Sequence, residues 1–366
     1  MTELNRQQTG TYRRHLLGLI GAGTAALAGC SDADDDELLD DGTDDTDDDS
    51  DADGTTDESE PSDDETADDE SDVEGSLPPY SSTLASMDDL SSTDYFYTAA
   101  DLDTIVETLD DDPGDGEMPN DPLLVNPIAT VSLGIYGLFN LGLSPVAEAQ
   151  ATAEQPAEHP TLLYLEGAYV LYGSYDRDLA AGELESAGYD QTGGGDDAGY
   201  IVFTDETSSE VIGVTDEAFI YSFGDDESRA ESVVTTIARA NTGDQSPKHD
   251  TDDVFETLLR ESDETGITCG LYGNGETLSD LETDQVNEDD INFDFAPYEG
   301  ATGVVQGLTV DGNRSNARAT VTYETADDVD SERLEDRLGT EAGSVDIEIA
   351  ENTATVAAAY ETDVID

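Results

Sequence analysis

Few residues of this 366-residue chain have side chains suited to catalysis or to tight metal binding. It has two cysteines, Cys30 and Cys269, and once the N-terminal segment is set aside only two histidines, His159 and His249, which lie far apart. A zinc site needs clustered Cys and His ligands, and a nucleophile needs a base beside it. The sequence also lacks a Gly-x-Ser-x-Gly elbow and a phosphate-binding glycine loop. It therefore predicts no catalytic residue, no metal site and no cofactor.

The neighbours of these residues predict ordinary structural roles for them. Cys269 lies in the strand-like run Ile267-Thr268-Cys269-Gly270-Leu271, which favours a small buried apolar side chain over a reactive thiol. His249 stands beside Asp250 near a turn and is interpreted as a solvated loop histidine. Carboxylates are so frequent that no pair stands out as the acid and base of a glycosidase.

The charge balance is extreme. The chain has 90 Asp and Glu against 12 Lys and Arg, a net charge of −78, and its only lysine is Lys248. Self-repulsion of this size would expand a compact chain in dilute buffer, but above ~1 M salt the Debye length falls to about 3 Å. The bias resembles that of haloarchaeal proteins, so it indicates a habitat. Scattered basic residues exclude nucleic acids and electrostatic docking on anionic lipids.

The N-terminus has the pattern of an export signal. Arg13 and Arg14 precede an uncharged run that continues to Gly29. That run is short for a membrane-spanning helix, which needs about 20 apolar residues. A basic start, a short apolar run and small residues at its end are typical of a cleaved signal. The arginine pair followed by Leu16 and Leu17 resembles a twin-arginine signal, which implies export after folding.

The signal ends in a recognisable tetrapeptide. Leu27-Ala28-Gly29-Cys30 resembles a lipobox, which implies cleavage after residue 29, a lipid on Cys30 and anchoring at the extracellular face of the cell membrane. The alternative is an uncleaved membrane helix with an incidental cysteine. The membrane, reached through this lipid, is the one partner that the sequence predicts.

An acidic linker, residues 30–79, follows the signal. Its core, residues 31–74, has 25 acidic and no basic residues, a composition that cannot form a packed core and predicts a disordered stalk. The positions Asp49, Asp51, Asp53, Gly54 and Glu60 match the spacing of an EF-hand loop. No helix is expected on either side, so loose association of cations with the stalk is the preferred interpretation.

The rest of the chain predicts an α+β fold of two related mixed modules with largely antiparallel sheets, residues 80–243 and 250–366. The boundary falls at 243–249, where turn residues gather. In the first module we expect strands at 95–97, 162–172 (broken at Glu166-Gly167), 200–204, 210–214 and 218–223, with helices at 101–109, 178–187 and 227–240. In the second we expect a helix near 251–259, strands at 266–272, 301–310 and 317–324, a helix at 327–338 and a terminal hairpin. The triplet Gly193-Gly194-Gly195 is interpreted as a turn.

Two further features bear on function. Residues 122–147 carry no charge. Prolines, asparagines and glycines interrupt the run, which favours a buried or amphipathic helix over a spanning one. Asn313-Arg314-Ser315 is an N-glycosylation acceptor sequence between two expected strands.

The stretch 167–176 and the strand pair before the 227–240 helix resemble haloarchaeal twin-arginine-exported lipoproteins of uncharacterised function, and the resemblance implies no active site. We expect a non-catalytic interaction or envelope module, whose protein or small-molecule ligand the sequence does not identify. The alternatives are a solute-binding lipoprotein, with residues 122–147 lining an apolar groove, and a hydrolase built on dispersed carboxylates. A deep apolar cleft would favour the former and a deep acidic cleft the latter.

Overall fold

The computed structural model describes residues 75–87, 90, 94–102, 104–105, 119–157, 159–205, 208–224, 226–262, 266–273, 278, 293–311 and 314–361. In this part of the chain the fold is α+β, with six α-helices and a 12-stranded sheet in which every neighbouring pair is antiparallel. The strand order is β13-β14-β12-β11-β10-β1-β3-β4-β9-β8-β7-β6. A further pair of two-residue strands, β2 and β5, stands apart from this sheet.

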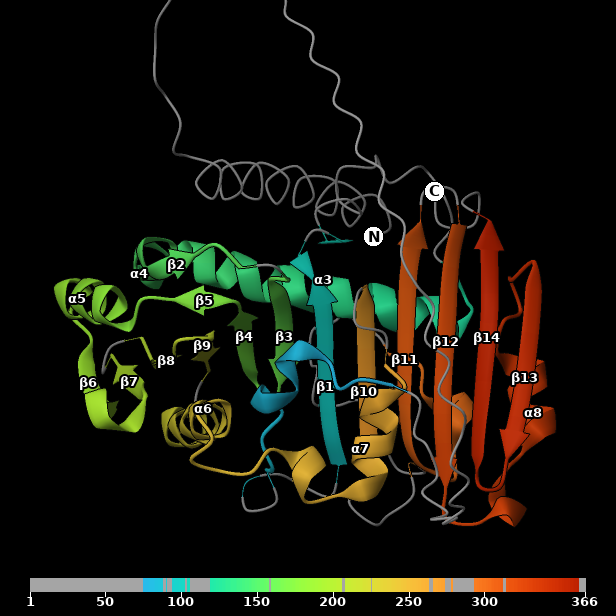
Figure 1. Cartoon of the computed structure of the whole chain (residues 1–366). Helices are drawn as coiled ribbons and strands as arrows, with labels where there is room; N and C mark the ends of the chain where they lie inside the picture. Colours follow the sequence, from blue (N-terminus) through green and yellow to red (C-terminus); the bar gives the residue numbers. More distant parts are fainter. Residues whose placement is uncertain are drawn as a thin grey trace, which may run out of the picture.

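The strand β1 (Asp94–Asp101) joins the two halves of the sheet (Figure 1). It pairs with β10 from Asp94 to Ala100 and with β3 from Tyr97 to Asp101. The expected first module thus contributes β1, β3, β4 and β6–β9, and the expected second module contributes β10–β14. Their hydrogen bonding is continuous across β1, so these twelve strands form one sheet.

The elements of the first half follow β1 in a regular order. The helices are α3 (Pro122–Leu143), α4 (Val146–Ala153), α5 (Arg177–Ala187) and α6 (Glu227–Asn241). The strands are β2 (Glu154–Gln155), β3 (Thr161–Leu165), β4 (Ala168–Tyr172), β5 (Ser174–Tyr175), β6 (Asp190–Gly195), β7 (Tyr200–Thr204), β8 (Glu210–Val214) and β9 (Ala218–Phe223).

The second half supplies the other edge of the sheet. Its helices are α7 (Asp253–Arg260) and α8 (Ser331–Arg337). Its strands are β10 (Ile267–Gly273), β11 (Ala301–Asp311), β12 (Arg314–Tyr323), β13 (Ser344–Ala350) and β14 (Thr353–Glu361). Short 3₁₀ turns η1 (Pro79–Thr83) and η3 (Lys248–Asp250) lie near α6 and α7.

Helices cover both faces of the sheet and enclose two hydrophobic cores. One core lies between the sheet and α3, α4, α5 and α8, and contains Leu123, Val131, Phe219, Leu334 and Val356. The other lies between the sheet and η1, α6 and α7, and contains Tyr95, Val234, Ile237 and Phe255. Figure 1 shows α3 running across the strands on one face, with α6 and α7 on the other.

The acidic composition has a direct structural use at helix ends. Five helices begin after an aspartate whose carboxylate accepts a bond from a backbone N–H of the first turn: Asp121, Asp176, Asp226, Asp252 and Asp330. Such a cap satisfies an N–H that the helix leaves unpaired and places negative charge at the positive end of the helix dipole.

The coarse prediction of an α+β fold with antiparallel strands is confirmed, and several details are wrong. Gly193, Gly194 and Gly195 belong to the edge strand β6, where they pair with β7 beyond a register shift. The apolar residues of α7 are not all buried: Phe255, Leu258 and Leu259 are, but Val254 is 43% exposed. On β12, the polar Thr320 and Thr322 are buried although they alternate with the apolar residues, while Arg318 is exposed. Of the predicted helix 101–109, Asp101 is the last residue of β1, residues 102 and 104–105 are helical, and the others lie outside the described residues.

Candidate functional site

The residues with the strongest sequence signals lie outside the described part of the chain. These are Arg13, Arg14, Leu16 and Leu17 of the export signal, Leu27, Ala28, Gly29 and Cys30 of the lipobox, and Asn313 of the glycosylation sequence. The same holds for the acidic stalk of residues 31–74 and its EF-hand-like pattern. Their assignments stay predictions.

The remaining chemical candidates are not brought together. Cys269 is completely buried on β10, as expected, and burial raises the pKa of its thiol. His159 is exposed just before β3. The expectation that His249 is solvated is wrong, because it is only 8% exposed and burial lowers its pKa. Among the described residues, no group of three or more His, Cys, Asp or Glu could hold a metal ion.

A buried carboxylate at the start of α3 is the first of three polar clusters that sequence reasoning missed. Asp121 is fully buried and accepts hydrogen bonds from the Leu123 N–H at 3.2 Å, the Gly339 N–H at 3.1 Å, the Glu341 N–H at 3.3 Å and the Tyr360 hydroxyl at 2.9 Å. These donors come from α3, the segment after α8 and β14. The carboxylate is therefore a clasp between distant elements, and the Asp-Pro pair at a helix start was the signal that could have revealed it.

A chain of buried amides continues from this clasp. Asn126 donates to the Gln306 Oε1 at 2.6 Å and to the Asp294 carbonyl at 3.0 Å, and its own Oδ1 accepts from the Asp294 N–H at 2.6 Å. Gln306 then donates to the Tyr298 hydroxyl at 2.6 Å. Both amides are fully buried. Since their hydrogen bonds are made within the protein, the network fixes α3 on the sheet and leaves no group poised for a substrate.

The third cluster surrounds Glu210 at the start of β8. Its carboxylate accepts bonds from the hydroxyls of Tyr189 and, at 2.7 Å, Tyr221, and from the Ser208 hydroxyl at 3.1 Å. Burial, together with the bond to Glu210, raises the pKa of Tyr189 to about 12. The tyrosines thus stay protonated as donors to a buried carboxylate, an arrangement that holds the β8–β9 pair against the segment before β6.

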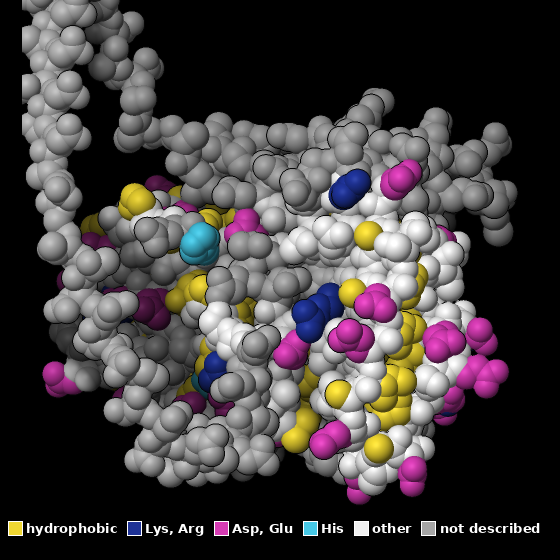
Figure 2. Space-filling model, turned by 45° about the vertical axis from the view of Figure 1, so that its right-hand side comes forward, with side chains coloured by type: hydrophobic (Ala, Val, Ile, Leu, Met, Phe, Trp, Pro, Cys, Tyr) yellow, Lys and Arg dark blue, Asp and Glu magenta, His cyan; other side chains and the backbone are white. Residues whose placement is uncertain are grey.

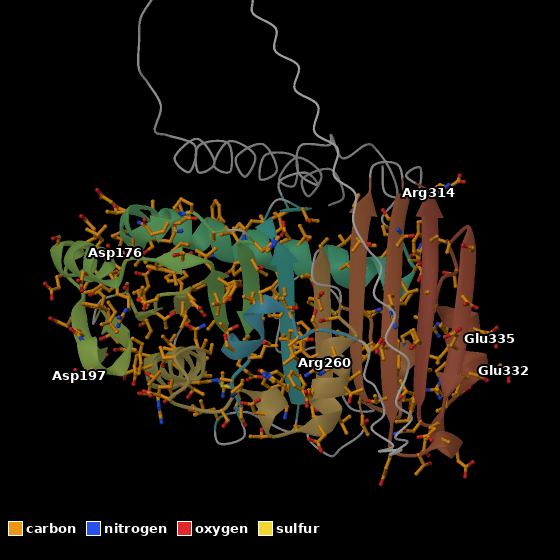
Figure 3. All side chains as sticks on the ribbon, in the orientation of Figure 1. Asp176, Asp197, Arg260, Arg314, Glu332 and Glu335 are labelled. Atoms are coloured by element: carbon orange, nitrogen blue, oxygen red, sulfur yellow. The ribbon has the colours of Figure 1, made fainter. Side chains whose placement is uncertain are left out.

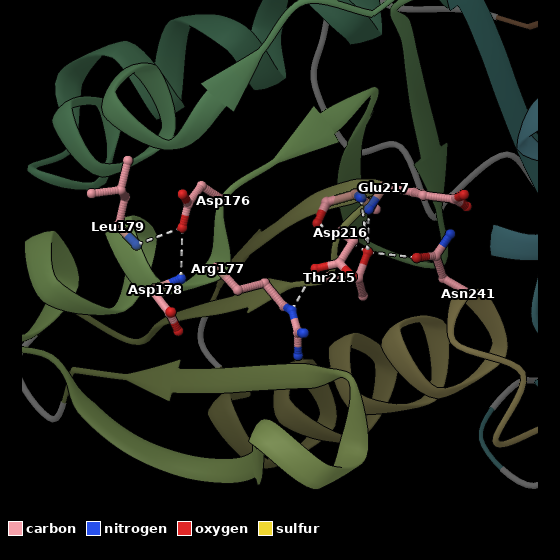
Figure 4. Close-up of polar contacts among 9 residues, drawn as sticks. Asp176, Arg177, Asp178, Leu179, Thr215, Asp216, Glu217 and Asn241 are labelled. Carbon is pink, nitrogen blue, oxygen red and sulfur yellow. Dashed lines mark hydrogen bonds and ion pairs between the residues drawn. The ribbon is translucent and has the colours of Figure 1, made fainter.

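Another set of polar contacts, drawn in Figure 4, stabilises the start of α5 and the turn between β8 and β9. Asp176 accepts from the N–H groups of Asp178 and Leu179, both at 3.1 Å. Arg177 bonds Asp216 at 2.6 Å, and Thr215 accepts from the Ala218 N–H at 2.8 Å. The Asp176 bonds cap the helix, the Thr215 bond closes the turn, and the Arg177–Asp216 ion pair joins the helix start to the turn, so the set is structural.

An open acidic depression of about 640 Å³ lies beside α8 in the described part of the chain. Its lining includes the carboxylates Glu299, Glu324, Asp327, Asp328, Asp330 and Glu332. Arg333 lies among them and pairs with Asp330 at 3.1 Å and with Glu299 at 3.5 Å. In Figure 3 Glu332 projects from α8 away from the sheet. The depression is open, and its lining also includes Ser331.

Surface charge follows the composition. Figure 2 shows Asp and Glu side chains distributed over the face that includes α8 and the edge of the sheet, with few Lys or Arg among them. The labelled charged residues in Figure 3, from Asp176 and Asp197 to Glu335, likewise lie around the periphery without converging. The face in view therefore presents dispersed negative charge, and the depression beside α8 is where described carboxylates gather.

The uncharged segment near residue 122 is a helix packed on the sheet. The helix α3 is long and apolar enough to cross a membrane, but 61% of its most apolar window is buried within the protein. It contacts β1, β10 and β11 directly. The preferred prediction of a buried helix is confirmed for residues 122–143, and Pro127 lies inside it.

Comparisons with known proteins give no family. No family model and no curated protein matches the chain. Among solved structures, crystal forms III and I of the Treponema protein TP0453 share 10% sequence identity, with TM-scores of 0.37 and 0.36. These alignments cover 79% of this chain and 96% and 95% of TP0453. Scores this low carry no functional argument.

Proposed function

We propose that this protein is an exported, lipid-anchored surface protein of a halophile whose folded part is a non-catalytic interaction or envelope module. The observation that carries the proposal is the tetrapeptide Leu27-Ala28-Gly29-Cys30, placed between a short uncharged run and a long acidic segment. In this scheme residues 1–29 are a twin-arginine signal and Cys30 bears the lipid. The linker of residues 30–79, disordered along its acidic core 31–74, holds the domain off the membrane.

The same proposal divides the folded part into two related α+β modules, residues 80–243 and 250–366. In support, each module places one Asp-capped helix, α6 or α7, on the same face of the sheet. We also infer an N-glycan at Asn313, loose binding of cations by the linker and no association with nucleic acids. The protein or small molecule that the modules bind is not identified by these features.

A non-catalytic role is favoured by the separation of the reactive side chains. Cys269 is buried on β10, His249 is buried beside α7, and His159 is exposed near β3. The solute-binding alternative would need space between α3 and the sheet, where strand side chains are packed. The hydrolase alternative would use the acidic depression beside α8, whose open form supports it less well.

Combined replacement of the three candidates tests this inference. A His159→Gln, His249→Gln, Cys269→Ala variant should retain the cellular role of the protein, because none of the three side chains touches a substrate. The measurement is complementation of a deletion strain, with surface abundance and circular dichroism matched to wild type. Failure of a folded, equally abundant triple variant to complement would show that the protein uses one of these groups in catalysis.

Export is tested separately. Replacing Arg13 and Arg14 by lysine keeps the charge, but Lys lacks the planar guanidinium that distinguishes the pair. The variant should accumulate as an uncleaved precursor in the cytoplasm, which immunoblotting of cell fractions would detect. Normal surface display of the Lys-Lys variant would contradict the twin-arginine assignment.

A further inference from the structure

The segment that leads into the folded domain is a buried strap. We define the strap as residues 75–87; it lies over the face of the sheet that carries α6 and α7, and includes η1. Five of its side chains are at most 3% exposed: Tyr80, Thr83, Leu84, Ala85 and Met87. A segment at the domain boundary normally frays unless it is tied down, so the contacts that tie this one are informative.

Hydrogen bonds to the strap come from both halves of the chain. The Gly75 carbonyl accepts a hydrogen bond from the Arg260 guanidinium at 3.0 Å, and the Leu84 carbonyl accepts one from the Lys248 N–H at 2.8 Å. The Ala85 carbonyl accepts from the Tyr95 hydroxyl at 3.0 Å, and the Ser86 carbonyl from the Gln245 side-chain amide at 3.2 Å. Ala85 also forms an isolated bridge with Pro247. The donors belong to α7, β1 and the connection between α6 and α7, so the strap spans the junction of the two halves.

The only lysine of the chain lies at this junction. Lys248 is 2% exposed, and its ammonium faces the rings of Tyr272 at 4.9 Å, Tyr95 at 5.5 Å and Phe255 at 5.6 Å. It also pairs with Asp252 at 3.2 Å. Desolvated cation–π contacts are stronger than exposed ones. A compact ammonium can approach several rings at once, whereas the planar guanidinium of arginine is larger.

We propose that Lys248 and its aromatic cage form a latch that holds the strap on the domain. The cage orders η3, whose Lys248 N–H bonds Leu84, and Tyr95 is both a wall of the cage and a donor to Ala85. Loss of the ammonium releases the strap while the sheet stays folded. Because the latch is buried, it works without the salt that screens the surface charges. The latch is independent of the lipid anchor; with the proposed anchor, it fixes the point where the linker leaves the domain, beside α7.

Hydrogen exchange of the full-length protein in molar salt tests the latch. Lys248→Met keeps the length and apolar stem of the side chain and removes the charge. In this variant the amides of Leu84, Ala85 and residue 248 should exchange about tenfold faster than in wild type, or more. The exchange rates of the β8 and β9 amides should be unchanged. The ratio of variant to wild-type exchange rates in the strap should be the same at 2 M and 4 M NaCl. Arg239→Met, which removes an exposed cation from α6, is the matched control and should leave the strap protected.

Two results would overturn the latch. One is equal protection of the strap in Lys248→Met and wild type. The other is faster exchange that affects the strap and the central strands equally, since Lys248 would then support the whole fold without a specific effect on the strap. If Lys248→Met does not fold, Lys248→Arg carries the same comparison, because it retains a cation but not a compact ammonium. Strap protection unchanged in that variant would contradict the proposal.

Discussion

Asp121 is a single residue that joins several distant parts of the described fold. Its carboxylate joins α3, the segment after α8 and β14 through four donors. Asp121→Ala should lower the free energy of unfolding by about 3 kcal/mol or more, because buried donors would lose their acceptor. Urea unfolding in molar salt measures this, with Tyr360→Phe as the control that removes one donor and costs about 1 kcal/mol. A loss for Asp121→Ala no larger than that of Tyr360→Phe would contradict the clasp.

A second residue, His249, gives a prediction about pH. Burial is the largest influence on the pKa of His249 and lowers it. The carboxylates of Asp250 and Glu256 raise this pKa, and the positive charge of Arg260 lowers it slightly further. His249 therefore binds a proton more readily in the unfolded chain than in the folded one. The free energy of unfolding falls as the pH drops through the unfolded-state pKa of about 6.5 towards the lower folded-state pKa. Above pH 7 the effect vanishes.

The histidine effect is isolated by difference. Wild type should lose more stability than His249→Gln between about pH 7 and pH 5, measured by urea unfolding at constant salt. His159→Gln, which replaces an exposed histidine, is the control. Parallel pH profiles for wild type and His249→Gln would show that burial of the imidazole does not affect folding.

The candidate residues also show what local sequence can and cannot reveal. The predicted burial of Cys269 is correct because apolar neighbours in a strand-like run report directly on burial. His249 was misjudged because Lys248 and Asp250 beside it suggest solvent, while the aromatic cage that buries this turn comes from β1, α7 and β10. Gly339, Glu341 and Tyr360, which bond Asp121, lie more than 100 residues from it, and so does Asn126 from Gln306. No local pattern identifies these distant partners.

At the scale of the elements, two glycines differ in the space that surrounds them. Gly270 on β10 lies under the ring of Tyr97, and an added Cβ would approach the Tyr97 Cε1 to 2.1 Å. Gly270→Ala should therefore cost about 1–3 kcal/mol by overpacking. Gly182 in α5 has no atom within 4 Å of such a Cβ, and Gly182→Ala should stabilise by roughly 0.5–1 kcal/mol through helix propensity. Thermal or urea unfolding of both variants checks the opposite signs; equal signs would contradict the packing around β10.

Element positions were predicted well where periodicity is strong. The strands 200–204, 210–214 and 218–223 match β7, β8 and β9, and the helix 227–240 matches α6 to one residue. The edge strand β6 was missed because its three glycines indicate a turn, and only pairing with β7 makes it extended. The place of β1 between β3 and β10 could not be predicted, because hydrogen bonding between distant segments leaves no periodic signal.

At the scale of the whole molecule, charge governs stability. The net charge of −78 and the acidic face in Figure 2 imply repulsion that exceeds a typical net stability of ~5–15 kcal/mol unless salt screens it. Circular dichroism should show loss of folded signal on dialysis from 4 M to about 0.05 M NaCl. An unchanged spectrum across that series would contradict a halophilic origin.

The lipid anchor at Cys30 is the central claim, and membrane fractionation of a Cys30→Ser variant tests it most directly. The wild-type protein should sediment with membranes after a high-salt wash, because acyl chains hold it by hydrophobic contact that salt does not weaken. The Cys30→Ser protein should be released into the soluble fraction, since the rest of the chain is too acidic to bind an anionic lipid surface. Retention of folded Cys30→Ser protein on washed membranes would contradict the anchor and direct attention to α3, the long apolar helix of the domain.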